Sequence, residues 1–218
     1  MAVNKETYQQ LVSTLSAKNV VLIAISKTKP VEDILELYHL GHRDFGENYV
    51  QELVEKAELL PKDIRWHFIG HLQSNKVKNI AAFIHLIHGV DSLKLLKEIN
   101  NQGKKNNRVI DCLLQVHIAQ EETKFGLNEE ELLQLLNGSI SQLRNIKICG
   151  LMCMASLTDN MNKVRNEFHF LKLLFTKLMT HDSRLTTLSM GMSGDYKIAI
   201  EEGSTMVRIG SLIFGERN

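Results

Sequence analysis

The sequence predicts an α/β fold: a single (β/α)8 barrel of the TIM type with an extra N-terminal helix, spanning residues 1–218. Apolar runs typical of buried strands alternate with amphipathic helical patterns eight times along the chain. With 218 residues and 44% hydrophobic content, the chain can bury one sizeable core. No linker rich in proline, glycine or serine divides it. A doubly wound open sheet is the alternative arrangement of the same elements.

The first half of the chain supplies an opening helix and four strand–helix pairs. The opening amphipathic segment spans Lys5–Ala17. The strand-like runs are Val20–Ser26, Arg43–Gly46, Ile64–Ile69 and Ile84–Val90. The helix after the third strand is expected to begin near Ser74. The helices after the other three strands are predicted by apolar residues at helical spacing. These are Ile34, Leu35, Leu37 and Tyr38 after the first strand, Val50, Leu53, Val54 and Ala57 after the second, and Leu93, Leu96 and Ile99 after the fourth.

The second half repeats the pattern four more times. Its strand-like runs are Val109–Ile118, Ile146–Cys153, Thr186–Met190 and Met206–Ile209. Helices are expected from about Glu129 and, as a short element, from Tyr196. The clearest helix follows the sixth strand, because its apolar residues alternate spacings of three and four and so share one face. They are Met161, Val164, Phe168, Leu171, Phe175 and Leu178.

The balance of charge argues against several classes of function. Lysine and arginine number 26 and acidic residues 25, so a net charge of +1 provides no field for nucleic acid or an anionic membrane. No apolar run reaches transmembrane length, and the N-terminus lacks the apolar core of a secretory signal. Cys112, Cys149 and Cys153 lie in apolar runs and are expected to be buried free thiols. These features favour a cytoplasmic protein.

The segment Val20–Pro30, VVLIAISKTKP, places two lysines at the end of a buried strand. Sites in parallel barrels are built at this edge of the sheet. A lysine held there can lose its proton and attack an aldehyde. Lys27 and Lys29 are two residues apart, so they face the same way in an extended segment. The pattern therefore does not choose between them.

Two loops rich in small residues follow the seventh and eighth strands, where barrels often hold phosphate. They are Gly191–Asp195 and Arg208–Ser211. Glycines allow close approach of the backbone, and serine hydroxyls with free N–H groups complete an anion site. Ordinary tight turns are the alternative. Phosphate loops facing a lysine predict a site for a phosphorylated aldehyde, and pyridoxal 5′-phosphate (PLP) is the commonest cofactor of that kind.

Several histidines and cysteines could suggest a metal site, but core packing explains them better. The close histidine pairs are His39 with His42, His67 with His71, and His85 with His88. No carboxylate or thiolate completes a set at a recognised ligand spacing. His67 lies inside a strand and is expected to be a core histidine with a hydrogen-bond partner. Cys149 and Cys153 are four apart on one strand and are expected to share a face.

Five motifs occur in order along the chain: AISKTKP (24–30), FGENYVQE (45–52), WHFIGHLQSNK (66–76), LSMGMSGD (188–195) and VRIGSLIFGER (207–217). On these motifs the chain closely resembles the pyridoxal phosphate homeostasis proteins over nearly its whole length. The fold of that family is like the N-terminal barrel of alanine racemase, fold type III. The resemblance implies PLP as the cofactor, held as a lysine Schiff base, and a role in vitamin B6 homeostasis.

The resemblance implies a cofactor-binding role for Lys27, Asn48, His71, Ser193, Gly194, Arg208, Gly210 and Ser211. On this resemblance, Lys27, the first lysine of SKTKP, is expected to carry the cofactor. Ser193 is expected to be a phosphate ligand, and Gly210 and Ser211 to be backbone donors to phosphate. Arg208 is expected to contact the ring nitrogen, as in the racemase relatives, or the phosphate. The resemblance implies neither a metal ligand nor a catalytic residue.

The chemistry of these positions favours a carrier over an enzyme. An arginine cannot accept a proton, so Arg208 at the ring nitrogen would leave PLP a weaker electron sink, which disfavours transamination but is compatible with racemisation. Racemisation needs acid–base groups on both faces of the substrate. The racemase relatives supply one from a second domain and a neighbouring subunit, and no second domain is expected here after the eighth strand.

The leading hypothesis is a cytoplasmic PLP carrier or buffer that is monomeric and contacts PLP-dependent apoenzymes transiently. The alternative is a small PLP-dependent amino-acid racemase or lyase. A third hypothesis is a phosphosugar or aldolase-type barrel that uses Lys27 without a cofactor.

Overall fold

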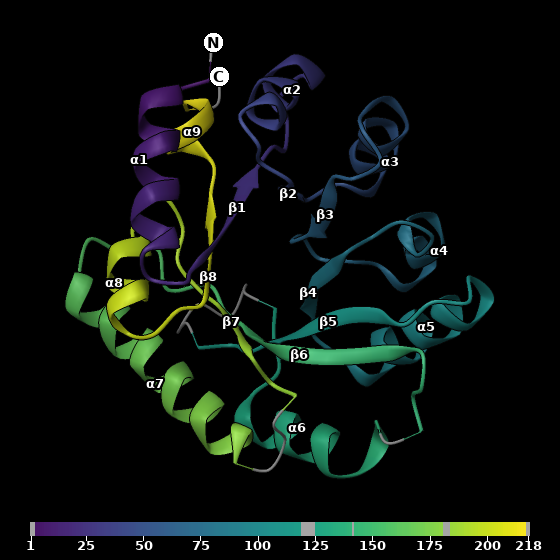
Figure 1. Ribbon diagram of the computed structural model, residues 1–218. Coiled ribbons are helices and arrows are strands. Elements are labelled where there is room, and N and C mark those ends of the chain that lie inside the picture. The colour runs from purple at the N-terminus through teal and green to yellow at the C-terminus, as the bar shows by residue number, and fades with distance from the viewer. Residues whose placement is uncertain (1–2, 119–124, 141, 181–183, 217–218) are drawn as a thin grey trace.

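A computed structural model describes residues 3–118, 125–140, 142–180 and 184–216, and their strands form a closed barrel ringed by helices (Figure 1). The strands pair in parallel and in chain order from β1 to β8. β1 (Val21–Ile25) also pairs with β8 (Met206–Ile209), with Ile23 opposite Arg208. This last pairing closes the ring, so the predicted (β/α)8 barrel is confirmed and the open sheet is excluded.

Each of the other strands overlaps the run predicted for it. They are β2 (Asp44–Glu47), β3 (Arg65–Phe68), β4 (Leu86–Val90), β5 (Ile110–Gln115), β6 (Ile146–Met152) and β7 (Thr187–Ser189). The side chains of these strands alternate between the barrel interior and the layer under the helices, as a pleated strand requires. One apolar cluster lies in the interior, and it comprises Ile23, Ile25, Leu86, Leu113, Cys149, Met152 and Met206.

The helices surround the barrel, and all but the last, α9, follow the predicted pattern. They are α1 (Lys5–Ser16), α2 (Val31–His39), α3 (Val50–Leu59), α4 (Val77–Ile80), α5 (Leu93–Lys105), α6 (Glu129–Gln134), α7 (Met161–Met179), α8 (Tyr196–Glu201) and α9 (Ser211–Phe214). A 3-10 turn, η1 (Ser74–Lys76), precedes α4, and a π-helical turn, η2 (Leu135–Ser139), follows α6. Asn4, Ser92, Asn128 and Asn160 begin their helices by accepting a backbone hydrogen bond.

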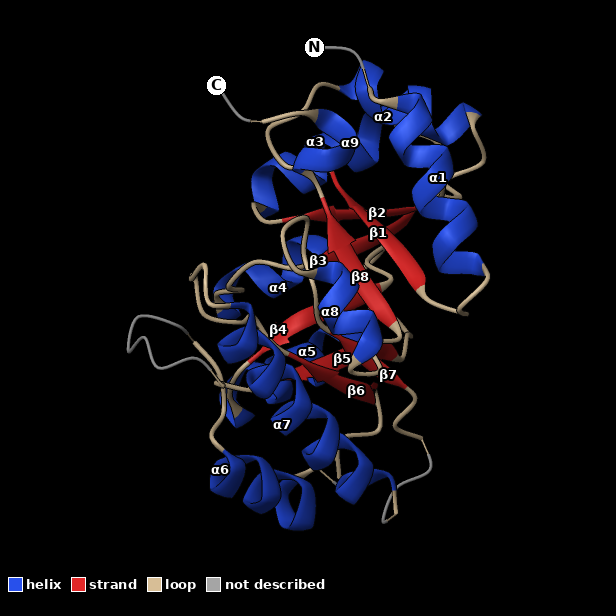
Figure 2. Ribbon diagram, turned by 90° about the vertical axis from the view of Figure 1, so that its left-hand side faces the viewer, coloured by secondary structure: helices blue, strands red, loops and turns tan. Residues whose placement is uncertain are grey.

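The extra N-terminal helix lies beside the short α9, which the sequence pattern did not predict (Figures 1 and 2). The backbone N–H of Asn4 donates to the carbonyl of Ile213 at 2.8 Å. Because α9 follows β8 directly, α1 supports the loop that carries Gly210 and Ser211.

The expectation that Cys149 and Cys153 share a face of β6 is wrong. Cys149 belongs to the interior cluster, whereas Cys153 packs in the core under the helices. The register of β5 against β6 shifts between Cys112 and Leu113, which pair with Ile148 and Gly150. One extra residue in a strand reverses the alternation beyond it. All three cysteines are nevertheless buried free thiols, as predicted.

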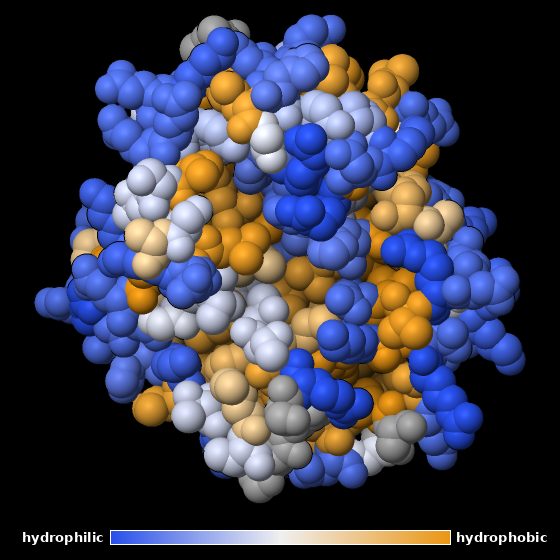
Figure 3. All heavy atoms as spheres, in the orientation of Figure 1, coloured by the Kyte–Doolittle hydropathy of each residue, from blue (hydrophilic) through white to orange (hydrophobic). Residues whose placement is uncertain are grey.

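Hydrophilic side chains cover much of the rim of the face in Figure 3, and apolar surface is visible toward its middle. None of the helices in the described ranges is both long enough and apolar enough to cross a membrane.

Candidate functional site

A cavity of about 570 Å³ lies at the carboxyl ends of the strands. Seven of the eight residues that the resemblance singled out line it, and they are Lys27, Asn48, Ser193, Gly194, Arg208, Gly210 and Ser211. These residues follow or end β1, β2, β7 and β8, so the barrel brings together positions up to 184 residues apart. Four apolar side chains, absent from the sequence-based set, complete much of the wall: Ile25, Ile69, Met154 and Met192.

The loop after β1 separates the two lysines that the sequence pattern left equivalent. The chain turns at Thr28, whose φ of 62° lies in the left-handed region, and the N–H of Lys29 donates to the carbonyl of Ser26 at 3.0 Å. The segment is therefore a turn and not an extended strand, yet both lysines still line the cavity. Lys29 Nζ donates to the carbonyl of Phe214 at 2.9 Å, which holds it toward α9.

A buried ionic network holds the chain on both sides of Lys27. Lys56 Nζ, on α3, donates to Glu47 Oε1 at 2.8 Å, to Glu52 Oε1 at 2.7 Å and to the carbonyl of Ser26 at 2.7 Å. The Ser26 hydroxyl donates to Glu47 Oε1 at 2.6 Å, and Glu52 Oε1 accepts from the N–H of Thr28 at 2.5 Å. Ser26 and Thr28 are thus fixed directly before and after Lys27.

Sequence reasoning missed this network, although one signal was present. Lys56 follows Leu53 by three residues and so lies on the inner face of the helix, and both are buried. A lysine on that face needs partners, because an unpaired buried charge is costly. Burial raises the pKa of the Glu47 carboxyl, while the ammonium of Lys56 acts in the opposite direction.

The loops after β7 and β8 are joined to each other beside the cavity. The Ser193 hydroxyl oxygen accepts from the N–H of Gly210 at 3.3 Å. Gly191 has a φ of 98°, and a Cβ there would lie 2.6 Å from the Cβ of Ala199, so the turn requires glycine. The Asp195 carboxylate accepts from the N–H of Met192 at 2.6 Å and closes the turn before α8.

Three backbone N–H groups on the cavity wall are unpaired donors among the described residues. Within the described ranges, no acceptor is found for the N–H groups of Ser193, Gly194 and Ser211. Ser193 and Gly194 lie in the turn that precedes α8, and Ser211 is the first residue of α9, where backbone N–H groups have no partner within the helix. The two loops can therefore bind an anion with three or more oxygens, such as a phosphate.

Arg208 places a buried positive charge at the floor of the cavity. Its guanidinium donates to the carbonyl and hydroxyl oxygens of Ser189 at 2.9 and 2.7 Å, and to the carbonyl of Cys153 at 2.8 Å. Burial lowers the pKa of Arg208, and no carboxylate in the described part of the chain forms an ion pair with it. Its charge is available to an acceptor on a ligand, and both the ring nitrogen and the phosphate of PLP are acceptors.

Asn48 adds an unsatisfied oxygen to the same wall. Its Oδ1 is buried and has no hydrogen-bond partner among the described residues. Buried oxygens of this kind are rare in folded proteins, and a ligand donor commonly explains them. The cavity thus offers an amine, three N–H donors, a buried guanidinium and one acceptor, which suits a small phosphorylated aldehyde with a polar ring.

His71, the eighth residue of the set, does not line the cavity. Its Nδ1 lies 3.2 Å from Asp91 Oδ2, and its ring stacks on Phe125 with centroids 4.3 Å apart. The side chain is exposed. Its role near a cofactor stays a prediction.

Comparison with known proteins places the chain in one family. The family described as alanine racemase, N-terminal domain, matches residues 4–218. The pyridoxal phosphate homeostasis protein of Aquifex aeolicus is 45% identical over 198 residues, which cover 90% of this chain and 86% of the relative. The Homo sapiens protein of the same name is 39% identical over 210 residues, covering 90% and 76%.

Solved structures agree with this placement. The structure of PipY from Synechococcus elongatus PCC7942 with PLP bound superposes with a TM-score of 0.87 at 35% identity, covering 96% of this chain and 100% of PipY. The same protein without PLP gives a TM-score of 0.91 at 36% identity, with coverages of 96% and 99%. Alanine racemase from Bartonella henselae, at 16% identity and a TM-score of 0.70, shares the fold over 97% of this chain and 59% of its own length.

Proposed function

The chain belongs to the alanine racemase N-terminal domain family, with the pyridoxal phosphate homeostasis proteins as its relatives, and from this premise we propose that it binds PLP in the cavity at the barrel mouth. In this proposal the protein carries or buffers PLP in the cytoplasm, as a monomer, and passes it to apoenzymes through transient contacts. It has no substantial catalytic activity of its own.

One observation carries the proposal: among the described residues, a half-buried lysine, three backbone N–H groups without an acceptor and a buried arginine without a carboxylate partner line one cavity. Each matches a different part of PLP, namely the aldehyde, the phosphate and an acceptor on the ring or phosphate. Asn48 Oδ1, a buried acceptor, matches a donor on the same ligand. The residues present therefore fit the cofactor.

The roles of the residues follow from their surroundings. PLP supplies an aldehyde that condenses with an amine to form a Schiff base, and water is released. Lys27 provides the amine, and the Lys56 network fixes the backbone on both sides of it. Ser193, Gly194 and Ser211 hold the phosphate through N–H groups that are unpaired among the described residues, and Gly210 lies beside them with its N–H donating to the Ser193 hydroxyl. Arg208 donates hydrogen bonds and cannot take up a proton, so it does not promote the electron withdrawal that transamination requires.

The test is borohydride reduction of the protein with PLP, followed by peptide mass mapping. We expect the reduced adduct on Lys27 and its loss in Lys27→Ala. Lys76→Ala, which changes an exposed lysine of η1, should keep it. An adduct that persists in Lys27→Ala and maps to Lys29 would contradict the assignment of Lys27. A protein that takes up no PLP would favour a barrel that uses Lys27 without a cofactor.

A second measurement separates a carrier from an enzyme. Purified protein is incubated with PLP and with L- or D-alanine and other amino acids, and products are followed by chiral chromatography. Sustained turnover with catalytic amounts of protein would establish the racemase or lyase alternative. We expect binding without turnover.

A further inference from the structure

A chain of buried polar side chains crosses the barrel interior from the amino ends of the strands to the cavity. It begins at Asp44, the first residue of β2, and ends at Arg208 of β8. Between them lie His67 of β3, His88 of β4 and Ser189 of β7, which are all buried. The links are Asp44 Oδ1 to His67 Nε2 at 3.1 Å, His67 Nδ1 to His88 Nε2 at 3.0 Å, His88 Nδ1 to the Ser189 hydroxyl at 3.3 Å, and that hydroxyl to Arg208 at 2.7 Å.

The two ends of the chain decide which way every hydrogen bond points. A carboxylate only accepts, so His67 Nε2 carries a proton and donates to Asp44. A guanidinium only donates, so the Ser189 oxygen accepts from Arg208 and its own hydrogen is free to donate. The remaining neighbour that accepts this hydrogen, within the described ranges, is Nδ1 of His88. His88 then donates through Nε2 to Nδ1 of His67.

Both histidines are therefore neutral and protonated on Nε2. A further proton on His67 Nδ1 would make two N–H groups face each other, and one on His88 Nδ1 would displace the hydrogen that the Ser189 hydroxyl donates to it. Burial lowers the pKa of both His67 and His88, in agreement with this count. The charged and titratable groups around the two rings are Asp44, Arg65, His85 and Arg208.

We propose that this chain orients the guanidinium of Arg208 at the cavity floor, and that Ser189, His88 and His67 are positioning residues for the bound ligand. Through the chain, the carboxylate of Asp44 at one end of the barrel is connected to the cation at the other. Only the expected effect of this hydrogen-bond chain on PLP affinity rests on the proposed function. The direction of the hydrogen bonds is a property of the protein alone.

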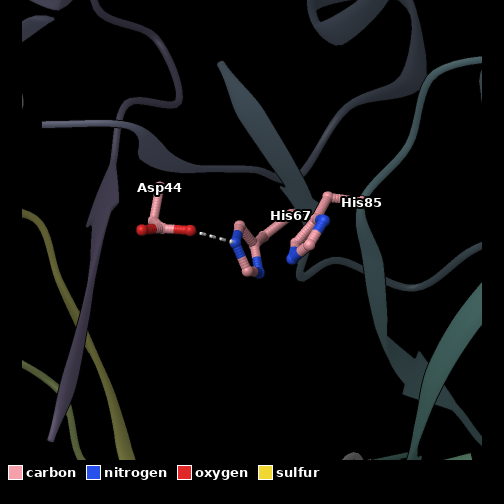
Figure 4. Close-up of side chains that lie close together, drawn as sticks. All are labelled: Asp44, His67 and His85. Atoms are coloured by element: carbon pink, nitrogen blue, oxygen red, sulfur yellow. Dashed lines mark hydrogen bonds and ion pairs between the residues drawn. The ribbon is translucent and has the colours of Figure 1, made fainter. Parts of the chain in front are cut away.

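The far end of the chain invites a different interpretation, a metal site. One ligand atom from each of Asp44, His67 and His85 lies within 4.8 Å of the others, and Figure 4 shows the His67 ring between the other two side chains. However, both oxygens of Asp44 already accept from Arg65, and Oδ1 also accepts from His67. His67 Nε2 carries a proton in the chain, so a metal ion would have to displace existing bonds at two of its three ligands.

The first experiment needs no PLP. Nitrogen-15 NMR of histidine-labelled, ligand-free protein reports which ring nitrogen carries the proton. We expect His67 and His88 to be neutral Nε2–H tautomers from about pH 6 to pH 8, across the range in which a free histidine titrates. A protonated Nδ1 on either ring, or titration of either histidine near its ordinary pKa, would contradict the proposed hydrogen-bond chain. So would stoichiometric binding of added Zn²⁺ that shifts the nitrogens of His67 and His85.

The second experiment measures the effect on the ligand by absorbance titration with PLP. His88→Leu breaks the chain, and we expect the PLP dissociation constant to rise about tenfold, the loss of one hydrogen bond to a charged group. His88→Gln keeps one acceptor and one donor and should restore most of the affinity. His85→Leu changes the exposed neighbouring histidine and should bind as the wild type does.

A purely structural role predicts a different pattern, in which affinity follows thermal stability and His88→Gln gives no rescue. Equal affinity of His88→Leu and the wild type would also refute a positioning role. If His88→Leu does not fold, Ser189→Ala interrupts the same chain and keeps the Ser189 carbonyl that Arg208 contacts. A wild-type protein that fails to bind PLP refutes the proposed function. The NMR result would still decide whether the hydrogen bonds from Asp44 to Arg208 run as proposed.

Discussion

The two ends of the barrel interior differ in how they use their hydrogen-bonding capacity. At the carboxyl ends of the strands, Asn48 Oδ1 and the N–H groups of Ser193 and Ser211 have no partner within the described ranges. At the amino ends, Asp44 accepts from both Arg65 and His67. Unpaired polar groups on a cavity wall cost stability unless a ligand satisfies them, whereas paired groups contribute to stability directly.

This difference separates residues that bind from residues that hold the fold. Changes at unpaired groups should alter ligand affinity with little effect on stability. Changes at fully paired buried groups should alter stability first, at either end of the barrel. Three substitutions test this division.

The largest effect is expected for Lys56→Met, because it leaves the buried Glu47 carboxylate without its cation. We expect the free energy of unfolding at neutral pH to fall by about 3 kcal/mol, which is typical for breaking a buried ion pair. Urea unfolding followed by circular dichroism measures it. The double variant Glu47→Gln/Lys56→Met is the control, since it removes the stranded charge and should recover part of the loss.

The loss in Lys56→Met should also depend on pH. Burial raises the pKa of Glu47 in the folded state above its ordinary value of 4.5. The folded protein therefore binds a proton more readily than the unfolded chain does, and stability rises as pH falls through the folded pKa. The deficit of Lys56→Met should narrow on acidification, and a deficit that grows in acid would contradict the pairing.

A smaller effect is expected for Asp44→Asn, which keeps an acceptor but removes the charge. Burial favours the protonated form of Asp44, but hydrogen bonds from Arg65 and His67 outweigh burial and hold its pKa well below the usual range. The contribution of Asp44 to the free energy of unfolding is fully present above the ordinary carboxyl pKa, near 4, and is lost as the pH falls through the pKa of Asp44 in the folded protein. We expect a loss of about 2 kcal/mol at pH 7 that shrinks in acid.

A matched surface change shows whether burial is the reason. Asp63 pairs with Arg43, but its side chain is 57% exposed. Asp63→Asn should therefore cost less than about 1 kcal/mol. Equal losses for the two aspartates would break the distinction between paired groups inside the barrel and those on its surface.

The smallest effect on stability is expected for Ser193→Ala, at the cavity. The hydroxyl accepts one long hydrogen bond, so the free energy of unfolding should change by less than about 0.5 kcal/mol. The dissociation constant for PLP should nevertheless rise about fivefold to tenfold, from the loss of a phosphate contact. Ser13→Ala, on the exposed face of α1, should change neither quantity. Unchanged PLP affinity in Ser193→Ala would remove this serine from the binding site.

Much of the fold could be predicted because the apolar periodicity of this chain is regular. The alternation of strands and helices led to the barrel, and each predicted run contains or overlaps a strand. The short α9 escaped prediction because four residues, Ser211–Phe214, are too few to show a helical period. The bulge in β6 escaped it because a change of one residue in register depends on how neighbouring strands pair, not on residue type.

The candidate site was predicted in part. The motifs around Lys27, Ser193 and Arg208 were visible as strand ends with glycine, serine and basic residues. The partners of these residues were not visible as partners. Lys56 lies outside the five motifs, and Glu52 and Ser189 lie inside two of them but form hydrogen bonds to residues of other strands and loops.

By itself, the sequence determined the order of strands and helices, the strand ends at which polar residues gather, and the family. These are local properties, set by side-chain periodicity and by runs of residues. The tertiary structure decided that Lys29 bonds to Phe214 while Ser26 and Thr28 are clamped around Lys27, and that His71 pairs with Asp91 away from the cavity. It also joined Asp44 to Arg208 through three intervening side chains. Such relations depend on closing the barrel, because only closure brings residues from β2, β3, β4, β7 and β8 within hydrogen-bond distance of one another.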